Sequence, residues 1–228
     1  LTALSILLLA LVALRLRESL PRESRSSMHP VYLIKTYFRV SSHARFMLIS
    51  LSSSMFFGGF FLYITSAPTM VYEHLGLGPN DFGYLFAMLV VGIMIGSRLS
   101  IQLAGIWNPR QQIGIGFGLM LLAALINLTL TRMLEPELLT TMLPVTLYAI
   151  GMALLMPVFT IMALDCFPNN RGLASSMTGF LQMGGNALVA GFVTPLLYHS
   201  VSKLSAGMLG FVLLALVLYW GSVRVEAT

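Results

Sequence analysis

Long apolar blocks, each about as long as a lipid bilayer is thick, constrain this chain more than any other feature. Seven blocks lie at about 1–16, 46–70, 82–104, 111–131, 139–163, 172–197 and 205–223. A helix of about 20 residues, rising 1.5 Å per residue, crosses a hydrocarbon core of roughly 30 Å. Lipid offers the backbone no hydrogen bonds, and the blocks lack the period-two alternation of a membrane β-barrel. The sequence therefore predicts an all-α membrane protein.

The composition supports this prediction and argues against other classes of protein. Hydrophobic residues make up 57% of the chain and charged residues 9%, with a mean hydropathy of +0.86. A soluble domain carries about 25% charged residues. The formal net charge is +5, but the basic residues lie at the ends of the blocks rather than in one patch, which argues against nucleic-acid binding. The single cysteine, Cys166, excludes a disulfide within this sequence.

The first block is apolar from Leu1 onward, with no basic segment before it. A cleaved signal peptide therefore fits it poorly. We expect this block to be the second part of a helix, and the chain to be a fragment or a truncated product of a longer gene.

The basic residues predict which side of the membrane each connection faces. If the long connection 17–45 is cytoplasmic, that side holds Arg15, Arg17, Arg22, Arg25, Lys35, Arg39, Arg45, Arg98, Arg110, Arg171 and Arg224. The other side then holds only Arg132 and Lys203. Because lysine and arginine are enriched in cytoplasmic loops, we expect the linker 17–45 and the tail 224–228 to be cytoplasmic.

The second part of this linker has an amphipathic pattern. Tyr32, Leu33, Tyr37 and Phe38 can share one helical face, opposed by Lys35 and Arg39. This predicts a helix lying on the membrane surface. An ordinary basic linker fits the same residues nearly as well.

Within 139–197, two apolar blocks flank a polar hairpin that runs from Asp165 to Arg171. The second of these blocks carries Gln182 and Asn186, four residues apart and so on one face of a helix. Polar side chains are unfavourable in contact with lipid. We therefore expect this face to line a cavity or to pack against other helices.

Three further features predict local structure. Pro68 should bend the block 46–70 near its outer end, since proline cannot donate a backbone hydrogen bond. Gly92-x-x-x-Gly96 should let a neighbouring helix approach closely. Arg98 should extend to the lipid headgroups at the inner surface.

Several of these segments resemble drug/proton antiporters of the major facilitator superfamily, and most closely the Bcr/CflA-type multidrug transporters. The run Pro168-Asn-Asn-Arg171-Gly172-Leu-Ala-Ser175-Ser176, followed by Gln182-Met183, is similar to their tenth loop and eleventh helix. Arg17-Glu-Ser-Leu-Pro21 is similar to the start of their central loop. Tyr63-Ile-Thr-Ser-Ala-Pro68 is similar to helix seven, although Ala67 interrupts the usual Ser-Pro pair. Tyr148-Ala-Ile-Gly151 with Pro157 is similar to helix ten.

The resemblance implies a fold, a location and an activity. Residues 1–16 would be the end of helix six, 17–45 the cytoplasmic central linker, and 46–223 helices seven to twelve, a six-helix half bundle. The protein would be a multi-pass protein of a bacterial inner membrane that exports small amphipathic or cationic compounds by alternating access, in exchange for protons. The family's proton-coupling acid would lie in the N-terminal half, outside this sequence. The substrate would bind near the midplane between the two halves.

None of the ionisable residues falls in the middle of an apolar block. The side chains that contact a substrate within the membrane must therefore be sought among neutral residues. Our candidates for substrate contact are Phe60, Tyr63, Ile64, Tyr148, Met152, Met156, Gln182, Met183 and Asn186. Aromatic rings attract flat or cationic compounds, methionine adapts to different shapes, and an amide orients a polar group. For the apolar candidates, packing or lipid contact is the competing interpretation. For Gln182 and Asn186 it is a hydrogen bond between helices.

A second set of residues is expected to act in gating or structure: Pro68, Arg98, Arg171, Gly172, Ser175 and Ser176. We expect Arg171 to contact lipid phosphates or the end of helix ten. The small residues that follow it should allow close helix packing, with a role in closing the inner mouth as the alternative.

Other classes of function fit less well. A major-facilitator carrier of a metabolite or nutrient would have the same fold. A seven-helix retinal protein would need a lysine inside a block, and none is present. His29, His43, His74 and His199 lie at or outside the block edges, so an intramembrane enzyme is not indicated. A non-transporting truncated product is a further alternative. We expect no enzymatic activity, cofactor, metal or nucleic acid; the expected partners are a small-molecule substrate, protons and membrane lipids.

Overall fold

A computed structural model describes residues 2–15, 37–78 and 81–226. The chain divides into two units, Leu1–Thr36 and Tyr37–Thr228. In the first unit, the helix α1 (Thr2–Arg15) ends in a basic residue, which suits the negative end of the helix dipole. Its apolar part, Thr2–Val12, is shorter than a membrane span.

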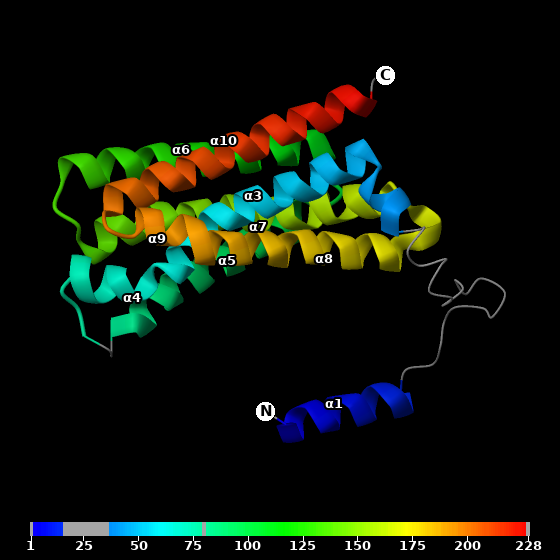
Figure 1. Ribbon diagram of the computed structural model, residues 1–228, viewed down its shortest axis with the longest axis horizontal. Helices are drawn as coiled ribbons and strands as arrows, with labels where there is room; N and C mark the ends of the chain where they lie inside the picture. The colour runs from blue at the N-terminus through cyan, green and yellow to red at the C-terminus, as the bar shows by residue number, and fades with distance from the viewer. Residues whose placement is uncertain (1, 16–36, 79–80, 227–228) are drawn as a thin grey trace. The chain divides into compact units, whose positions relative to one another are not determined.

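The second unit contains six helical stretches that are long and apolar enough to cross a membrane (Figure 1). They are α3 (Ala44–Thr65), α5 (Phe82–Leu103), α6 (Pro109–Met133), α7 (Leu138–Asp165), the stretch Pro168–Leu197 and α10 (Val201–Glu226). The stretch Pro168–Leu197 consists of the 3₁₀ helix η4 (Pro168–Asn170), α8 (Arg171–Leu188), the π-helix η5 (Val189–Val193) and α9 (Thr194–Leu197). The described residues contain no strand, only an isolated bridge between Ala104 and Trp107. The prediction of an all-α membrane bundle is confirmed.

A π-helical turn occurs beside a proline at two places in the second unit, whereas Pro144 and Pro157 lie inside α7 without interrupting it. After α3 ends at Thr65, the chain continues as α4 (Ala67–Thr69), which contains Pro68, and the π-helix η2 (Met70–His74). In the stretch Pro168–Leu197, η5 stands just before Pro195. Proline lacks the backbone N–H that an α-helix needs, and its ring clashes with the preceding turn. The hydrogen-bond pattern near these two prolines therefore changes locally from α-helical to π-helical. The expected irregularity at Pro68 is therefore present.

Helices α3 and α7 form the centre of the second unit. α3 packs against α10 and α8, α7 packs against α5 and α6, and α6 also contacts α10 (Figure 1). Accordingly, 61% of the α3 span and 56% of the α7 span are buried. The corresponding share is only 28% for α5 and 17% for the stretch Pro168–Leu197. These two flanking helices therefore leave most of their surface uncovered.

Glycines let α5 and α6 approach α7 closely. A Cβ atom at Gly92 would lie 2.6 Å from the carbonyl oxygen of Thr146, and one at Gly96 would overlap the carbonyl of Ile150. A Cβ atom at Gly151 would lie 2.8 Å from the carbonyl oxygen of Gly116 on α6. The close approach predicted for Gly92-x-x-x-Gly96 is confirmed.

Aromatic rings fill the centre of the bundle. Phe56, Phe117 and Phe159 meet edge to face, with ring centroids 5.2 to 6.3 Å apart, and Tyr219 of α10 lies 5.8 Å from Phe117. Such pairs stabilise a core by about 0.5–1.5 kcal/mol beyond the area they bury. This cluster joins α3, α6, α7 and α10 and so fixes the positions of α3 and α7 within the bundle.

Candidate functional site

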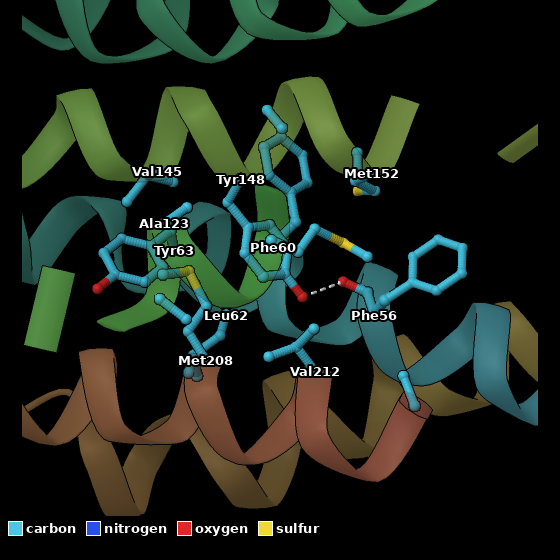
Figure 2. Packing of buried hydrophobic residues seen from close by; sticks show 14 of the residues in the cluster. Phe56, Phe60, Leu62, Tyr63, Ala123, Val145, Tyr148, Met152, Met208 and Val212 are labelled. Atoms are coloured by element: carbon cyan, nitrogen blue, oxygen red, sulfur yellow. Dashed lines mark hydrogen bonds between the residues drawn. The ribbon is translucent and has the colours of Figure 1, made fainter. Parts of the chain in front are cut away.

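Two of the candidate side chains, Tyr63 and Tyr148, lie inside the bundle with their hydroxyl groups bonded (Figure 2). The Tyr148 hydroxyl donates to the carbonyl oxygen of Phe56 at 2.8 Å. The Tyr63 hydroxyl accepts a hydrogen bond of 2.6 Å from Asn127 Nδ2 and lies 3.2 Å from Ser205 Oγ. Both rings are fully buried, so each hydroxyl joins helices of this bundle in the structure described.

The other candidates on α3 and α7 differ in how far their side chains are buried in the bundle. Phe60 and Met152 are buried, with exposed fractions of 2% and 3%, and both belong to the core cluster drawn in Figure 2. Ile64 and Met156 are half-buried and pack against the edge of that core. Ile64 and Met156 are therefore the apolar candidates of these two helices that reach the surface.

The contacts around α3 show which of its sides is free. Ser54 faces α8, Ser52 bonds to a carbonyl of α10, and the Phe56 carbonyl faces α7. At 100° per residue, the sector between the α8 side and the α7 side carries Phe57 and Ile64, both half-buried, whereas Phe61 falls on the α8 side with Ser50 and Ser54. Phe57 stacks on Phe61 with ring centroids 6.2 Å apart.

The same reasoning applies to α7. Thr146 and Ile150 face α5, Gly151 faces α6, and Tyr148 faces α3. Between the α3 side and the α5 side lie the buried Met152 and the half-buried Met156, whereas Thr160 falls on the α5 side with Ala149 and Ala153. This sector of α7 lies next to the α3 sector of Phe57 and Ile64.

Helix α8 adds two amides to this surface. Ser50 and Ser54 of α3 bond to Thr178 and to the carbonyl of Leu181, and Ser54 also lies against Gly185. Asn186 follows Gly185 by one position and is turned from it by about 100°, whereas Gln182 follows Thr178 by four positions and is turned from it by only about 40°. Placing the helices in their order around α3 puts both amides toward Phe57 rather than toward α10. We call the resulting surface the open flank; it comprises Phe57, Ile64, Met156, Gln182 and Asn186.

The two amides lack partners. Among the residues that the structure describes, neither the Gln182 nor the Asn186 side chain makes a hydrogen bond, and Asn186 Oδ1 is buried without one. The competing interpretation, a hydrogen bond between helices of this chain, is therefore not found. By contrast, Gln112 donates both to Ser100 Oγ and to the carbonyl of Leu154. Met183, the remaining candidate on α8, is 65% exposed.

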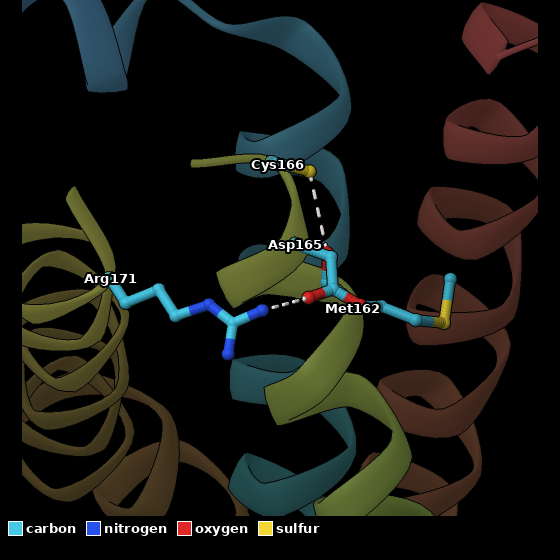
Figure 3. Close-up of polar contacts among 4 residues, drawn as sticks. All are labelled: Met162, Asp165, Cys166 and Arg171. Carbon is cyan, nitrogen blue, oxygen red and sulfur yellow. Dashed lines mark hydrogen bonds and ion pairs between the residues drawn. The ribbon is translucent and has the colours of Figure 1, made fainter. Parts of the chain in front are cut away.

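Four of the six residues expected to act in gating or structure lie at the start of α8, beside the hairpin that follows α7. Arg171 forms an ion pair of 2.9 Å with Asp165, the last residue of α7, and both side chains are more than half exposed (Figure 3). This is one of the two partners expected for Arg171. Ser176 lies 3.2 Å from the Tyr37 hydroxyl, while Ser175 is exposed.

Two glycines of this segment do not pack closely against another described element. Apart from the backbone of their own helix, no described atom lies within 4 Å of a Cβ atom placed at Gly172 or Gly179. Their surroundings within the described residues are open, and the expected close packing is not found there. Ala174, in contrast, is fully buried against the bundle.

The last two residues expected to act in structure or gating, Pro68 and Arg98, are exposed. Arg98 lines a shallow concavity of about 580 Å³ along α5, together with Ile93, Met94, Ser97, Ile101 and Gln102. Its long side chain can follow this surface, as expected for an arginine that reaches the headgroups. No group of three or more metal-ligating side chains occurs among the described residues.

The amphipathic segment proposed for the linker is described only in part. Residues 37–41 are helical, and Tyr37 and Phe38 are 41% and 74% exposed. Tyr32, Leu33 and Lys35 lie outside the described residues. The prediction of a surface helix therefore stays a prediction.

Reasoning from the sequence missed one residue of the open flank and one of the core network. Phe57 precedes Ile64 by seven positions, a spacing that marks one helical face. Asn127 is an amide in the otherwise apolar block 111–131, the same signal that pointed to Asn186. Only the structure shows that Asn127 is bonded to Tyr63.

A bundle of six long apolar helices is the architecture of a multi-pass integral membrane protein. The family model of the Major Facilitator Superfamily matches residues 1–190. The chain belongs to this family of membrane transporters.

A curated relative supports this assignment. The chain is 27% identical over 190 residues to the uncharacterized MFS-type transporter YdgK of Bacillus subtilis (strain 168). The match covers 83% of this chain and 46% of YdgK, so the chain spans about half the length of this relative. No solved structure shows a significant match.

Proposed function

We propose that this chain forms the C-terminal half of a secondary active transporter that exports small amphipathic or cationic compounds by alternating access, in exchange for protons. The supporting observation is the open flank, where aromatic, methionine and unbonded amide side chains of α3, α7 and α8 lie on one side of a membrane bundle. Aromatic faces attract cations, flexible methionine accommodates different shapes, and free amides offer both donors and acceptors.

The finer assignment, to the Bcr/CflA-type drug antiporters, depends on the similarity of the segments around Tyr63, Tyr148 and Arg171–Met183. Under this proposal residues 1–16 are the end of helix six, 17–45 the cytoplasmic linker and 46–223 helices seven to twelve, in the inner membrane of a bacterium. The coupling proton would bind in the preceding half. The membrane-spanning middle of the described helices has no acidic residue, which supports the placement of the proton-binding residue in the preceding half.

The test is a drug-susceptibility profile. The complete product of the gene that encodes this chain is expressed in a bacterial strain deprived of its own efflux pumps, and growth is measured against a panel of hydrophobic cations and neutral antibiotics. We expect resistance to several of them, and a changed profile in Gln182→Leu and Asn186→Leu at unchanged amounts of protein in the membrane.

Two outcomes would contradict the proposal. Unchanged susceptibility to every compound, together with uptake of a metabolite, would instead identify a nutrient carrier of the same family. Unchanged susceptibility without any transport would identify a product that does not transport. A profile that the two leucine variants leave unaltered would remove both amides from the site.

A further inference from the structure

We infer that the C-terminal part of α5 binds one anionic phospholipid, with Arg98 holding its phosphate. The inference does not depend on the proposed function, since it involves residues of α5 and none of the open flank. It starts from the shallow concavity of about 580 Å³ that Arg98 lines on this helix. This volume lies within the range of roughly 300–1,000 Å³ that is usual for small-molecule sites.

The residues that line the concavity change from apolar to polar along the helix. They form two rows with steps of four residues, Met94, Arg98 and Gln102 in one row and Ile93, Ser97 and Ile101 in the other. Each row begins with an apolar residue toward the middle of the span, and the three polar side chains follow nearer its C-terminal end. A phospholipid, which joins a polar headgroup to an acyl chain, has the same polarity.

This side of α5 is not covered by the rest of the described chain. Gly92 and Gly96 lie against α7, and Ser100 bonds to Gln112 of α6. Arg98 stands two positions from both Gly96 and Ser100 and is therefore turned from them by about 200°. The concavity is open along its length, which suits a ligand that belongs to the surrounding bilayer and needs no enclosed pocket.

Arg98 carries a positive charge without a counter-ion in the part of the chain that the structure describes. It forms no ion pair there, whereas Arg171 is paired with Asp165. The segment 82–134, which comprises α5, the following turn and α6, contains no acidic residue. Ser97 and Gln102 likewise make no hydrogen bond with described residues. A guanidinium group has five donors and binds phosphate oxygens in pairs, so these side chains together suit a phosphate.

The depth of Arg98 favours the phosphate of a lipid over a dissolved one. Arg98 precedes the last residue of α5, Leu103, by about 8 Å along the helix axis. The half-buried Trp107 follows in the turn, and tryptophan is typical of the membrane interface. Arg98 must therefore extend from the edge of the hydrocarbon toward the headgroups. An acyl chain covers the exposed Met94 and Ile101 beside it, which dissolved phosphate leaves in contact with water.

The charge of Arg98 also selects among phospholipids. A zwitterionic phospholipid carries an ammonium group beside its phosphate, whereas an anionic one carries no such charge and can neutralise the arginine. Basic sites at the membrane border bind anionic headgroups in this way. The preferred ligand is therefore an anionic phospholipid such as phosphatidylglycerol.

Native mass spectrometry tests this preference. The complete gene product is purified in detergent and titrated with phosphatidylglycerol or with phosphatidylcholine, and the bound lipid molecules are counted. We expect one molecule of phosphatidylglycerol to bind at least about tenfold more tightly than phosphatidylcholine, because hydrogen bonds to charged groups are strong. Glycerol 3-phosphate, which has the phosphate without the acyl chains, should not displace it.

Two arginine variants of the same charge assign the preference to the concavity. Arg98→Gln should lower the affinity for phosphatidylglycerol by about tenfold, since the guanidinium is lost. Arg110→Gln removes an equal charge from the exposed first turn of α6, outside the concavity, and should leave the affinity unchanged. Arg98→Lys, which retains the charge but not the paired donors, should fall between them. Gel filtration confirms that each variant is folded.

A crosslinking experiment shows what covers the concavity in the membrane. Photoreactive benzoylphenylalanine in place of Ile101 should crosslink to phospholipid. Absence of this crosslink, or a crosslink to another segment of the complete protein, overturns the inference. So does an equal affinity for both lipids, or an equal loss in Arg98→Gln and Arg110→Gln, which would indicate general attraction to the headgroups. Displacement by glycerol 3-phosphate would identify a site for free phosphate esters and overturn the assignment to lipid.

Discussion

At the scale of single residues, the polar groups of this bundle fall into two kinds. Tyr63, Asn127, Ser205 and Thr131 form a connected network between α3, α6 and α10. Gln182 and Asn186 lie next to an exposed flank and make no bonds within the described chain. The first kind stabilises the fold, and the second kind is free to bind.

This difference predicts unequal costs for two conservative substitutions. Tyr63→Phe removes the partner of Asn127 and Ser205, so we expect it to lower the free energy of unfolding by about 1–2 kcal/mol. Tyr148→Phe leaves a Phe56 carbonyl that still lies in a helix, and we expect a loss of about 0.6 kcal/mol. Thermal unfolding of the detergent-solubilised complete protein measures both.

The drug profile serves as the control for these two tyrosines. If Tyr63 binds substrate, as its sequence context suggested, Tyr63→Phe should alter the resistance profile at unchanged stability. That result would contradict the structural role inferred from its hydrogen bonds.

At the scale of the helix, close packing depends on where a glycine faces. Gly96 lies against the backbone of α7, whereas no described atom approaches the Cβ position of Gly118 on α6. Both glycines are in helices of similar length and apolar character. Their sequence neighbourhoods alone do not distinguish them.

The same substitution should therefore have opposite effects at the two positions. Gly96→Ala should destabilise the protein by about 1–3 kcal/mol, because the added methyl group forces α5 away from α7. Gly118→Ala should be neutral or stabilising by up to about 1 kcal/mol, since alanine favours a helix. The yield of monodisperse protein after heating in detergent reports both changes, and equal yields would contradict the close contact of α5 and α7.

At the scale of the whole molecule, the distribution of basic residues predicts its orientation in the membrane. Asn169, in the hairpin before α8, should face the cytoplasm, and Lys203, at the start of α10, should face the opposite side. Both side chains are exposed.

Cysteine labelling tests this orientation. In a cysteine-free version of the complete protein, a membrane-impermeant maleimide should label Lys203→Cys in intact cells. It should label Asn169→Cys only after the membrane is made permeable. The reverse pattern would place the hairpin outside and contradict the predicted orientation.

The sequence by itself determined the membrane environment, the helical class and the position of the six spans. These properties follow from the length and hydrophobicity of each block, because lipid forces the backbone to satisfy its hydrogen bonds locally. The irregularity at Pro68 could be predicted for the same reason, since proline acts within a few residues, whereas the contact of Gly92 and Gly96 with α7 needed the tertiary structure.

Only the tertiary structure decided what the polar and aromatic side chains do. Tyr63 and Phe57 belong to one apolar helix, yet one lies in a hydrogen-bond network of three helices and the other on the open flank. Asn127 and Asn186 are likewise amides in apolar blocks, and only one of them is bonded. The physical reason is that the neighbours of a helical face come from segments far apart in the chain, and the local pattern of residues does not specify which segment covers which face.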